Sequence, residues 1–192
     1  CRHPALIAET PELAALIRRA QVQGLSNNAS LPEQARQILE AADEARRPLT
    51  HEELLCICAA SGMAANLPQR LQSQANDLVN QARGHLLEHQ PQLVRPGGAL
   101  FPSERADACW RDCWNFLRVI VYAVACRRSD FTNPDGMAAL GELYRRMNVP
   151  MGGLNIALNQ LKVLAVQGIE RKADQILVSA CFQHLIEQLN KT

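Results

Sequence analysis

The chain has 192 residues, of which 47% are hydrophobic and 20% are charged, and its formal net charge is +1 at neutral pH. This composition excludes a largely disordered chain, and the small net charge gives no electrostatic reason to expect nucleic-acid binding. No stretch approaches the roughly 18 to 20 consecutive apolar residues of a membrane span. The length suits one domain with a substantial core. The sequence begins with Cys1 rather than methionine, so we expect the natural N-terminus and any targeting signal to lie upstream.

Residues that favour helices dominate the whole sequence, and runs of β-branched residues are nearly absent. We therefore predict an all-α chain of roughly eight helices around one core, with a piece up to about residue 45 that is only loosely attached. The expected helices cover residues 9–22, 31–47, 50–61, 67–94, 103–126, 137–148, 150–168 and 173–190. The loops between them are expected at residues 95–102 and 127–136, where proline, glycine and polar residues gather.

The third of these helices has clear start and stop signals. Thr50 can accept a hydrogen bond from the amide of Glu53, whose carboxylate can reach back to Thr50, which is a capping box. Gly62 suits the left-handed conformation that ends many helices. The preceding helix is expected to stop before Pro48.

Seven cysteines are distributed along the chain: Cys1, Cys56, Cys58, Cys109, Cys113, Cys126 and Cys181. An odd number in a large and ordinarily hydrophobic domain argues against a secreted disulfide scaffold. We predict that most of them are reduced thiols that pack as small apolar side chains. This cysteine usage favours a cytoplasmic or stromal compartment.

The stretch "ACWRDCW", residues 108–114, gathers two thiols, an arginine, an aspartate and two tryptophans. On a helix, spacings of three and four residues bring side chains onto one face. Arg111 then lies on the flank of that face. The side chains expected to share the face are Arg105, Cys109, Asp112, Cys113 and Phe116.

Four chemical interpretations of this stretch can be compared. The spacing of the two thiols is not the Cys-x-x-Cys of redox pairs, no histidine nearby completes a zinc site, and no local base would activate a catalytic thiol. The fourth interpretation is a covalent cofactor, with a thiol as the anchor, an arginine paired with a carboxylate and an aspartate that accepts ring N–H groups. A plain alternative stays open beside it, in which the cysteines fill the core and the Arg–Asp pair lies on the surface.

His85 and His89 have a spacing that can bind metal, but such a pair is more typical of a solvated helix face.

The wider context of the motif resembles phycobiliproteins, the bilin-carrying subunits of phycobilisomes. "CWRDCWNFLRVIVY" is similar to their chromophore-binding helix, and "PQLVRPGGALF" to the Pro-Gly-Gly loop before it. "GELYRRMNVP", "ADEARRPLTHEEL" and "ACFQHLI" resemble further family segments in the same order. The resemblance covers residues 35–192 and is nearest to allophycocyanin-type subunits. It implies an all-α, globin-like phycobiliprotein fold with N-terminal antenna helices, preceded by an N-terminal extension, residues 1–34.

This resemblance implies a pigment site and no catalysis. Cys109 would form a thioether to a linear tetrapyrrole of the phycocyanobilin type. Asp112 would accept hydrogen bonds from the two central pyrrole rings, and Arg111 and Arg105 would pair with the propionates. The expected function is light harvesting and transfer of excitation energy within an α/β-type assembly.

Several residues depart from the family pattern. Asn115 and Phe116 stand in the pigment site where the family usually has a pair of tyrosines, and Ala99 replaces the loop asparagine of β-type subunits. Trp110 and Trp114 flank the site atypically. These departures indicate a specialised paralogue. One alternative is therefore a structural or linker-associated subunit with weak or no bilin, and another is a globin-like cytosolic sensor.

The resemblance also implies partners. Asp43 matches the aspartate of the antenna helices, and Arg118 matches the arginine that such an aspartate meets across the α/β interface. The expected partners are other phycobiliprotein subunits and phycobilisome linkers in a hetero-oligomer, without nucleic acid and without insertion into a membrane. The expected location is the cytoplasmic or stromal face of the thylakoid membrane.

Overall fold

The computed structural model of the chain describes residues 10–191, which contain nine α-helices and two short 3-10 helices. The prediction of an all-α chain is confirmed for these residues, with one helix more than expected because one of the predicted helices is divided. Cys1 lies outside the described residues. The elements are α1 (Pro11–Arg19), η1 (Leu25–Asn27), α2 (Glu33–Glu44), α3 (His51–Ser61), α4 (Asn66–Ser73), α5 (Ala75–His89), η2 (Pro91–Val94), α6 (Ser103–Ala125), α7 (Pro134–Met147), α8 (Met151–Val166) and α9 (Lys172–Lys191).

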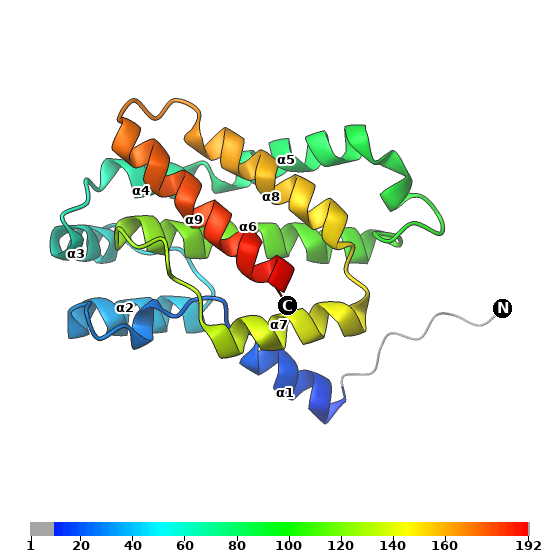
Figure 1. Ribbon diagram of the computed structural model, residues 1–192, viewed down its shortest axis with the longest axis horizontal. Coiled ribbons are helices and arrows are strands. Elements are labelled where there is room, and N and C mark those ends of the chain that lie inside the picture. The colour runs from blue at the N-terminus through cyan, green and yellow to red at the C-terminus, as the bar shows by residue number, and fades with distance from the viewer. Residues whose placement is uncertain (1–9, 192) are drawn as a thin grey trace.

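Helix α6 is the central element of the fold. It runs horizontally through Figure 1, with α4 and α5 above it, α2 and α7 below it, and α8 and α9 crossing its face. Every residue from 116 to 125 is buried, because helices cover this half of α6 on all sides. Such a helix must be apolar all round, which the run "VIVYAVA" provides.

Several predicted helices have different bounds in the structure, and the causes are visible for two of them. The long helix expected at residues 67–94 is divided at Gln74, and its last turn is the separate η2. The side-chain amide of Gln72 donates to the carbonyl of Leu49 at 2.8 Å and accepts from the amide of Leu49 at 3.1 Å, so the end of α4 is bound to a distant loop. Helix α2 ends at Glu44 rather than at residue 47, because Arg46 adopts a left-handed conformation with φ 48°.

The start and stop signals of α3 are confirmed. Thr50 and Glu53 form both hydrogen bonds of the capping box, and Gly62 is left-handed with φ 71°. Glu53 also receives two hydrogen bonds from the guanidinium of Arg47, at 2.7 and 2.8 Å. These bonds, chiefly those from Arg47, lower the pKa of the Glu53 carboxyl to about 2.

We predict that Glu53→Gln lowers the free energy of unfolding by about 1 kcal/mol at neutral pH, since both partners are partly exposed and screened by water. The folded-state pKa lies below the unfolded value of roughly 4.3, so the stabilisation is complete above that pH and is lost as the pH falls towards about 2. Urea midpoints should therefore differ at about pH 7 and converge only below about pH 2. Glu52→Gln, an exposed change in the same turn, is the control. Equal midpoints at neutral pH would contradict the prediction.

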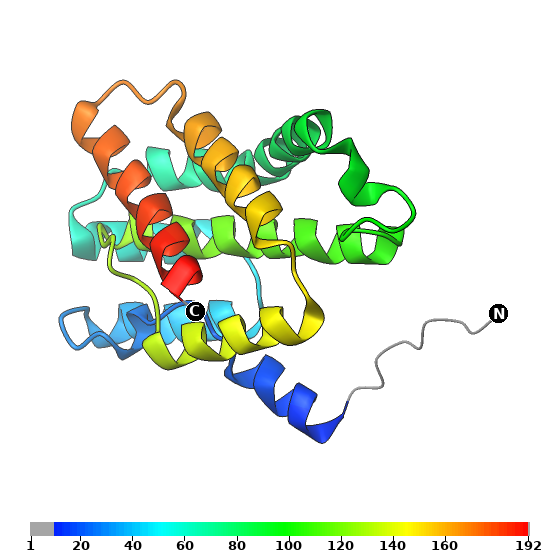
Figure 2. The same cartoon turned by 45° about the vertical axis from the view of Figure 1, so that its right-hand side comes forward.

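The N-terminal segment is packed on the rest of the chain, so the expectation of a loosely attached piece is wrong for the residues that the structure describes. Helix α1 lies along α7 (Figures 1 and 2). The backbone of Gln23 then forms an isolated antiparallel bridge with Thr132, and η1 packs on α2. Within residues 10–191, helix length and apolar content together fall short of what a bilayer crossing requires.

Candidate functional site

The first half of α6 and the second half of α7 form the candidate site. The two helices are joined by a short loop and run in opposite directions, so the beginning of α6 lies beside the end of α7 (Figure 1). Arg105 connects these two ends: its guanidinium donates to the carbonyls of Met147 and Asn148, both at 3.0 Å. This arrangement satisfies carbonyl groups that a helix C-terminus leaves without partners.

Asp112 and Tyr144 form the central contact of the site. The hydroxyl of Tyr144 donates to the carboxylate of Asp112 at 2.8 Å, across 32 positions of sequence. Burial raises the pKa of Asp112, although this hydrogen bond and the positive charges of Arg111 and Arg46 oppose the rise. Tyr144 is 6% exposed, and its pKa is raised by burial and by the neighbouring Asp112, Cys113 and Cys109. Tyr144 therefore stays a neutral donor, which orients the Asp112 carboxylate.

Cys109 and Cys113 lie one helical turn apart and are both buried, with 8% and 1% of their surface exposed. A hydrogen bond from Cys113 lowers the pKa of the Cys109 thiol, although burial and Asp112 act in the opposite direction. The same contact, with burial, raises the pKa of Cys113. Burial raises the pKa values of Cys126 and Cys181 to about 12. The six cysteines among the described residues are free thiols. The pKa of Cys109 is lowered, whereas burial helps to raise the pKa values of Cys58, Cys113, Cys126 and Cys181.

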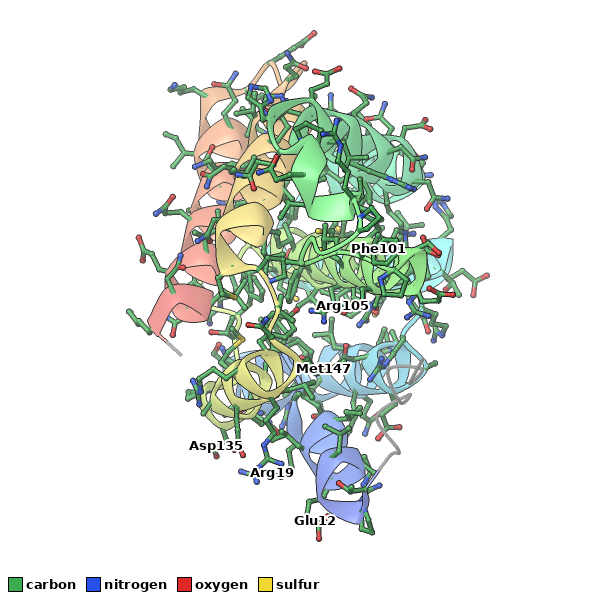
Figure 3. The ribbon with its side chains drawn as sticks, turned by 90° about the vertical axis from the view of Figure 1, so that its right-hand side faces the viewer. Glu12, Arg19, Phe101, Arg105, Asp135 and Met147 are labelled. Carbon is green, nitrogen blue, oxygen red and sulfur yellow. The ribbon has the colours of Figure 1, made fainter. Side chains whose placement is uncertain are left out.

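Two exposed apolar side chains lie beside Arg105. Figure 3 shows Arg105 between Phe101, on the loop before α6, and Met147, at the end of α7. Phe101 is 45% exposed and Met147 is 40% exposed. A flat conjugated ligand at this edge of the site would find apolar surface on both sides of the guanidinium.

Arg111 does not join Arg105 on the α7 side of the helix. It is exposed and lines an open groove of about 460 Å³ between α5 and α6, together with Trp110 and Trp114. The guanidinium of Arg83 lies 5.7 Å from the centre of the Trp110 ring, which is within the range of a cation–π contact. The tryptophans that depart from the family pattern thus form a second surface of α6, connected to the candidate site through Arg111.

Asn115 lies beside two arginines of α6, whereas Phe116 lies in the hydrophobic core. The amide of Asn115 donates to the carbonyl of Arg111 at 3.0 Å and accepts from Arg118 at 3.4 Å, so it contacts the arginines rather than Asp112. Phe116 is 3% exposed and belongs to the core. The roles expected for these two residues in pigment binding stay predictions.

Asp43 and Arg118 pair with each other within one chain. A guanidinium nitrogen of Arg118 lies 2.9 Å from the Asp43 carboxylate, and the two side chains are 13% and 6% exposed for Asp43 and Arg118, respectively. Arg118 also donates to the hydroxyl of Tyr122 at 2.7 Å. The sequence predicted that this aspartate and arginine meet across a subunit interface; the structure joins α2 to α6 of the same molecule, and a role between subunits stays a prediction.

Residues 37–189 match the family model described as phycobilisome protein. The chain belongs to the phycobilisome protein family. This phycobilisome protein is 30% identical to allophycocyanin subunit beta-18 of Porphyra purpurea over 126 residues, which are 63% of this chain and 73% of the relative. It is 27% identical to the C-phycocyanin beta subunit of a Nostoc species over 153 residues, which are 78% of this chain and 88% of the relative. It is 25% identical to allophycocyanin subunit alpha-B of a Synechocystis species over 152 residues, which are 78% of this chain and 94% of the relative.

The fold of this phycobilisome protein is similar to that of a far-red fluorescent biliprotein derived from an allophycocyanin F subunit of Chroococcidiopsis thermalis. The two structures superpose with a TM-score of 0.59 and 21% sequence identity, over 66% of this chain and 96% of that one. The expected globin-like phycobiliprotein fold is thereby confirmed.

The sequence did not indicate the side chains that complete the candidate site. Tyr144 lies in the segment "GELYRRMNVP" that resembles the family, but no local pattern shows that its hydroxyl contacts Asp112. The positive charge of Arg46 opposes the rise in the pKa of Asp112, but Arg46 lies far from Asp112 in the sequence and no spacing rule connects the two. Cys113 was recognised as a neighbour of Cys109, but its effect on that thiol depends on side-chain geometry.

Proposed function

We propose that this phycobilisome protein carries one covalently attached linear tetrapyrrole of the phycocyanobilin type on Cys109 and passes its excitation energy to neighbouring pigments. The observation that carries the proposal is the gathering of the Cys109 thiol, an oriented carboxylate and an arginine along the Cys109–Asp112 face of α6. Membership of the phycobilisome family and the similarity to proteins named allophycocyanin and phycocyanin support it.

The residues present fit such a ligand by their chemistry. Cys109 would hold it through a thioether. Asp112 would accept hydrogen bonds from pyrrole N–H groups and keep the pigment extended, while Tyr144 keeps the carboxylate oriented. Arg105, beside the end of α7, would pair with a propionate, and the propionate pairing expected of Arg111, which lines the groove between α5 and α6, stays a prediction. A bound tetrapyrrole would supply visible-light absorption, and the protein side chains would supply attachment and rigidity; the role is pigment carriage rather than catalysis.

A second candidate function is that of a structural or linker-associated subunit with weak or no bilin. Two observations favour it. The Cys109 thiol is only 8% exposed, and the guanidinium of Arg105 is engaged by the carbonyls at the end of α7. A pigment would have to open this contact or share it.

Assembly is part of the proposal. We expect other phycobiliprotein subunits and phycobilisome linkers as partners in a hetero-oligomer at the cytoplasmic or stromal face of the thylakoid membrane. The names of the relatives, which are α-type and β-type subunits, support this expectation.

The test uses the protein purified from cells that make bilins. After denaturing electrophoresis in the presence of zinc, the chain should fluoresce, since a thioether survives denaturation. Cys109→Ala should abolish the signal, whereas Cys58→Ala, which changes a buried thiol of α3 outside the site, should retain it. A colourless wild-type chain would overturn the pigment proposal and favour the structural subunit. A Soret band in the absorption spectrum would indicate haem instead.

A further inference from the structure

Residues 10–24, which we call the N-terminal clamp, lie before the segment that matches the family model, yet they pack closely on α7. Leu16 of α1 is 4% exposed and Ala139 of α7 is 2% exposed, and neither belongs to the main hydrophobic core. The contact between the two helices is therefore a separate small apolar interface.

The backbone of the clamp is also bound to the loop that precedes α7. The amide of Gly24 donates to the carbonyl of Phe131 at 2.7 Å, and the amide of Asn133 donates to the carbonyl of Val22 at 2.8 Å. Asn133 is the residue whose side chain caps the beginning of α7. The clamp thus holds the start of α7 through the main chain as well as through α1.

Gly136, in the first turn of α7, shows how close this approach is. A Cβ atom added there would lie 1.7 Å from the carbonyl oxygen of Gln21, which is far inside any allowed contact. The backbone of Gly136 is ordinary helix, so the glycine is required by the proximity of the clamp and not by its own conformation.

The opposite side of α7 faces the candidate site. Tyr144 donates to Asp112, and the carbonyls of Met147 and Asn148 accept from Arg105. Helix α7 therefore packs on the clamp on one side and is linked to α6 by hydrogen bonds on the other, and Figure 3 shows α6 and α7 from their ends. A movement of α7 would displace the Tyr144 hydroxyl from the carboxylate that it orients.

We propose that the N-terminal clamp is a positioning element of the site: it holds α7 beside α6, so that the Tyr144 hydroxyl stays hydrogen-bonded to Asp112 and the Cys109 thiol stays covered. The effect of the clamp on pigment fluorescence rests on the proposed function, whereas its effect on the position of α7 does not. A chain with the matched family segment alone would lack this contact, so the clamp would set the rigidity of the site in this particular subunit.

The first experiment tests the contact between the clamp and α7, and it asks whether a substitution at Gly136 raises or lowers the melting temperature of the full chain. Alanine favours a helix over glycine, so Gly136→Ala should raise the melting temperature if the clamp is not docked and lower it if it is. Gly84→Ala is the matched control, because a Cβ added at Gly84 on α5 meets nothing within 4 Å, and it should raise the melting temperature. A higher melting temperature for Gly136→Ala would overturn the proposal.

The second experiment tests the connection to the site in the pigment-free full chain, by labelling with iodoacetamide under native conditions. Trypsin cleaves after Arg105, Arg111 and Arg118, so Cys109 and Cys113 appear on separate peptides. Leu16→Asp should raise the labelling rate of Cys109 about three- to tenfold, since weakening a local contact increases the open population by such factors. Glu12→Gln, at the outer end of α1, should leave the rate unchanged.

Cys181, on α9, separates a local change from general unfolding. Faster labelling of Cys109 with an unchanged rate for Cys181 supports the proposal. Equal acceleration of both thiols, or no acceleration of Cys109, would overturn it.

The third measurement uses the pigmented protein. Leu16→Asp should reduce the fluorescence yield and broaden the absorption band, and Tyr144→Phe should reproduce both effects with α1 intact. A pigmented variant with unchanged spectra would overturn the optical part of the proposal. A wild-type chain without pigment would instead overturn the proposed function, and the thiol-labelling result would still decide whether the clamp positions α7.

Discussion

Replacing Arg118 by methionine should lower the free energy of unfolding by about 3–5 kcal/mol, the range typical of removing one partner from a buried ion pair. The Arg118 guanidinium lies 2.9 Å from the carboxylate of Asp43, and the side chain of Asp43 is only 13% exposed. Without the guanidinium, this carboxylate would keep its charge in a place that water scarcely reaches, or would have to take up a proton.

The loss would extend beyond the pair, because Arg118 is part of a larger network. Arg118 donates to the hydroxyl of Tyr122, which in turn donates to the carbonyl of Arg47 in the loop between α2 and α3. Arg47 forms the ion pair with Glu53 at the start of α3. The network therefore binds α2, its following loop and α3 to the central helix.

Urea denaturation measures the effect. The double variant Asp43→Leu with Arg118→Met should recover much of the stability, since replacing both members of a buried pair by apolar groups is often close to neutral. Arg128→Met, on the loop after α6, is a less buried control of the same chemical type. A loss below about 1 kcal/mol for Arg118→Met would show that the pair is screened as at a surface, contrary to its burial.

The same variants bear on assembly. Charge reversal at Asp43 or Arg118 is expected to weaken association with a partner subunit, which sedimentation of the complex would detect. Because the pair lies within one chain, sedimentation should be measured at a temperature where the variant is still folded. Unchanged sedimentation of a folded variant would contradict the predicted interface role.

Asp112→Asn should separate pigment attachment from pigment rigidity. The proposed attachment is through Cys109, so the zinc-enhanced fluorescence of the denatured chain should stay at the wild-type level. The fluorescence yield of the native protein should fall by about ten- to a hundredfold, because a charge-assisted hydrogen bond of about 1.5–3 kcal/mol would be lost from the extended pigment. The asparagine has nearly the same size, and it still accepts from Tyr144 but no longer carries the charge.

Native fluorescence yield, normalised to the covalently bound pigment, is the measurement. Asp107→Asn on the same helix is the matched control, because Asp107 is exposed and lines the groove between α5 and α6. Tyr144→Phe should have an intermediate effect, since the carboxylate stays but loses its orienting donor. A native yield within twofold of the wild type for Asp112→Asn would contradict the role given to this carboxylate.

Local signals in the sequence were sufficient for most of the helices, though not for the division at Gln74, and for one face of the site. Thr50, Glu53 and Gly62 bounded α3 correctly, because caps depend on residues three or four positions apart. The same periodicity grouped Cys109, Asp112 and Cys113 on one side of α6, and the structure agrees, since Cys109 and Asp112 both raise the pKa of the Cys113 thiol. The order of motifs along the chain was sufficient to predict the family, which the match over residues 37–189 shows.

The tertiary structure alone decided which distant side chains meet. The contact of Tyr144 with Asp112 spans 32 positions, and the pairing of Asp43 with Arg118 joins two helices that are not neighbours in the sequence. Gly136 was expected only as the last residue of the loop at residues 127–136, although the carbonyl of Gln21 occupies the space where a Cβ would lie. Helix propensity and periodicity report on interactions within a few residues, whereas these contacts depend on how whole helices pack on one another. For this reason the sequence by itself determined the helical class and the chemistry that α6 carries, and only the packing of α1, α7 and α2 around α6 decided how that chemistry is held.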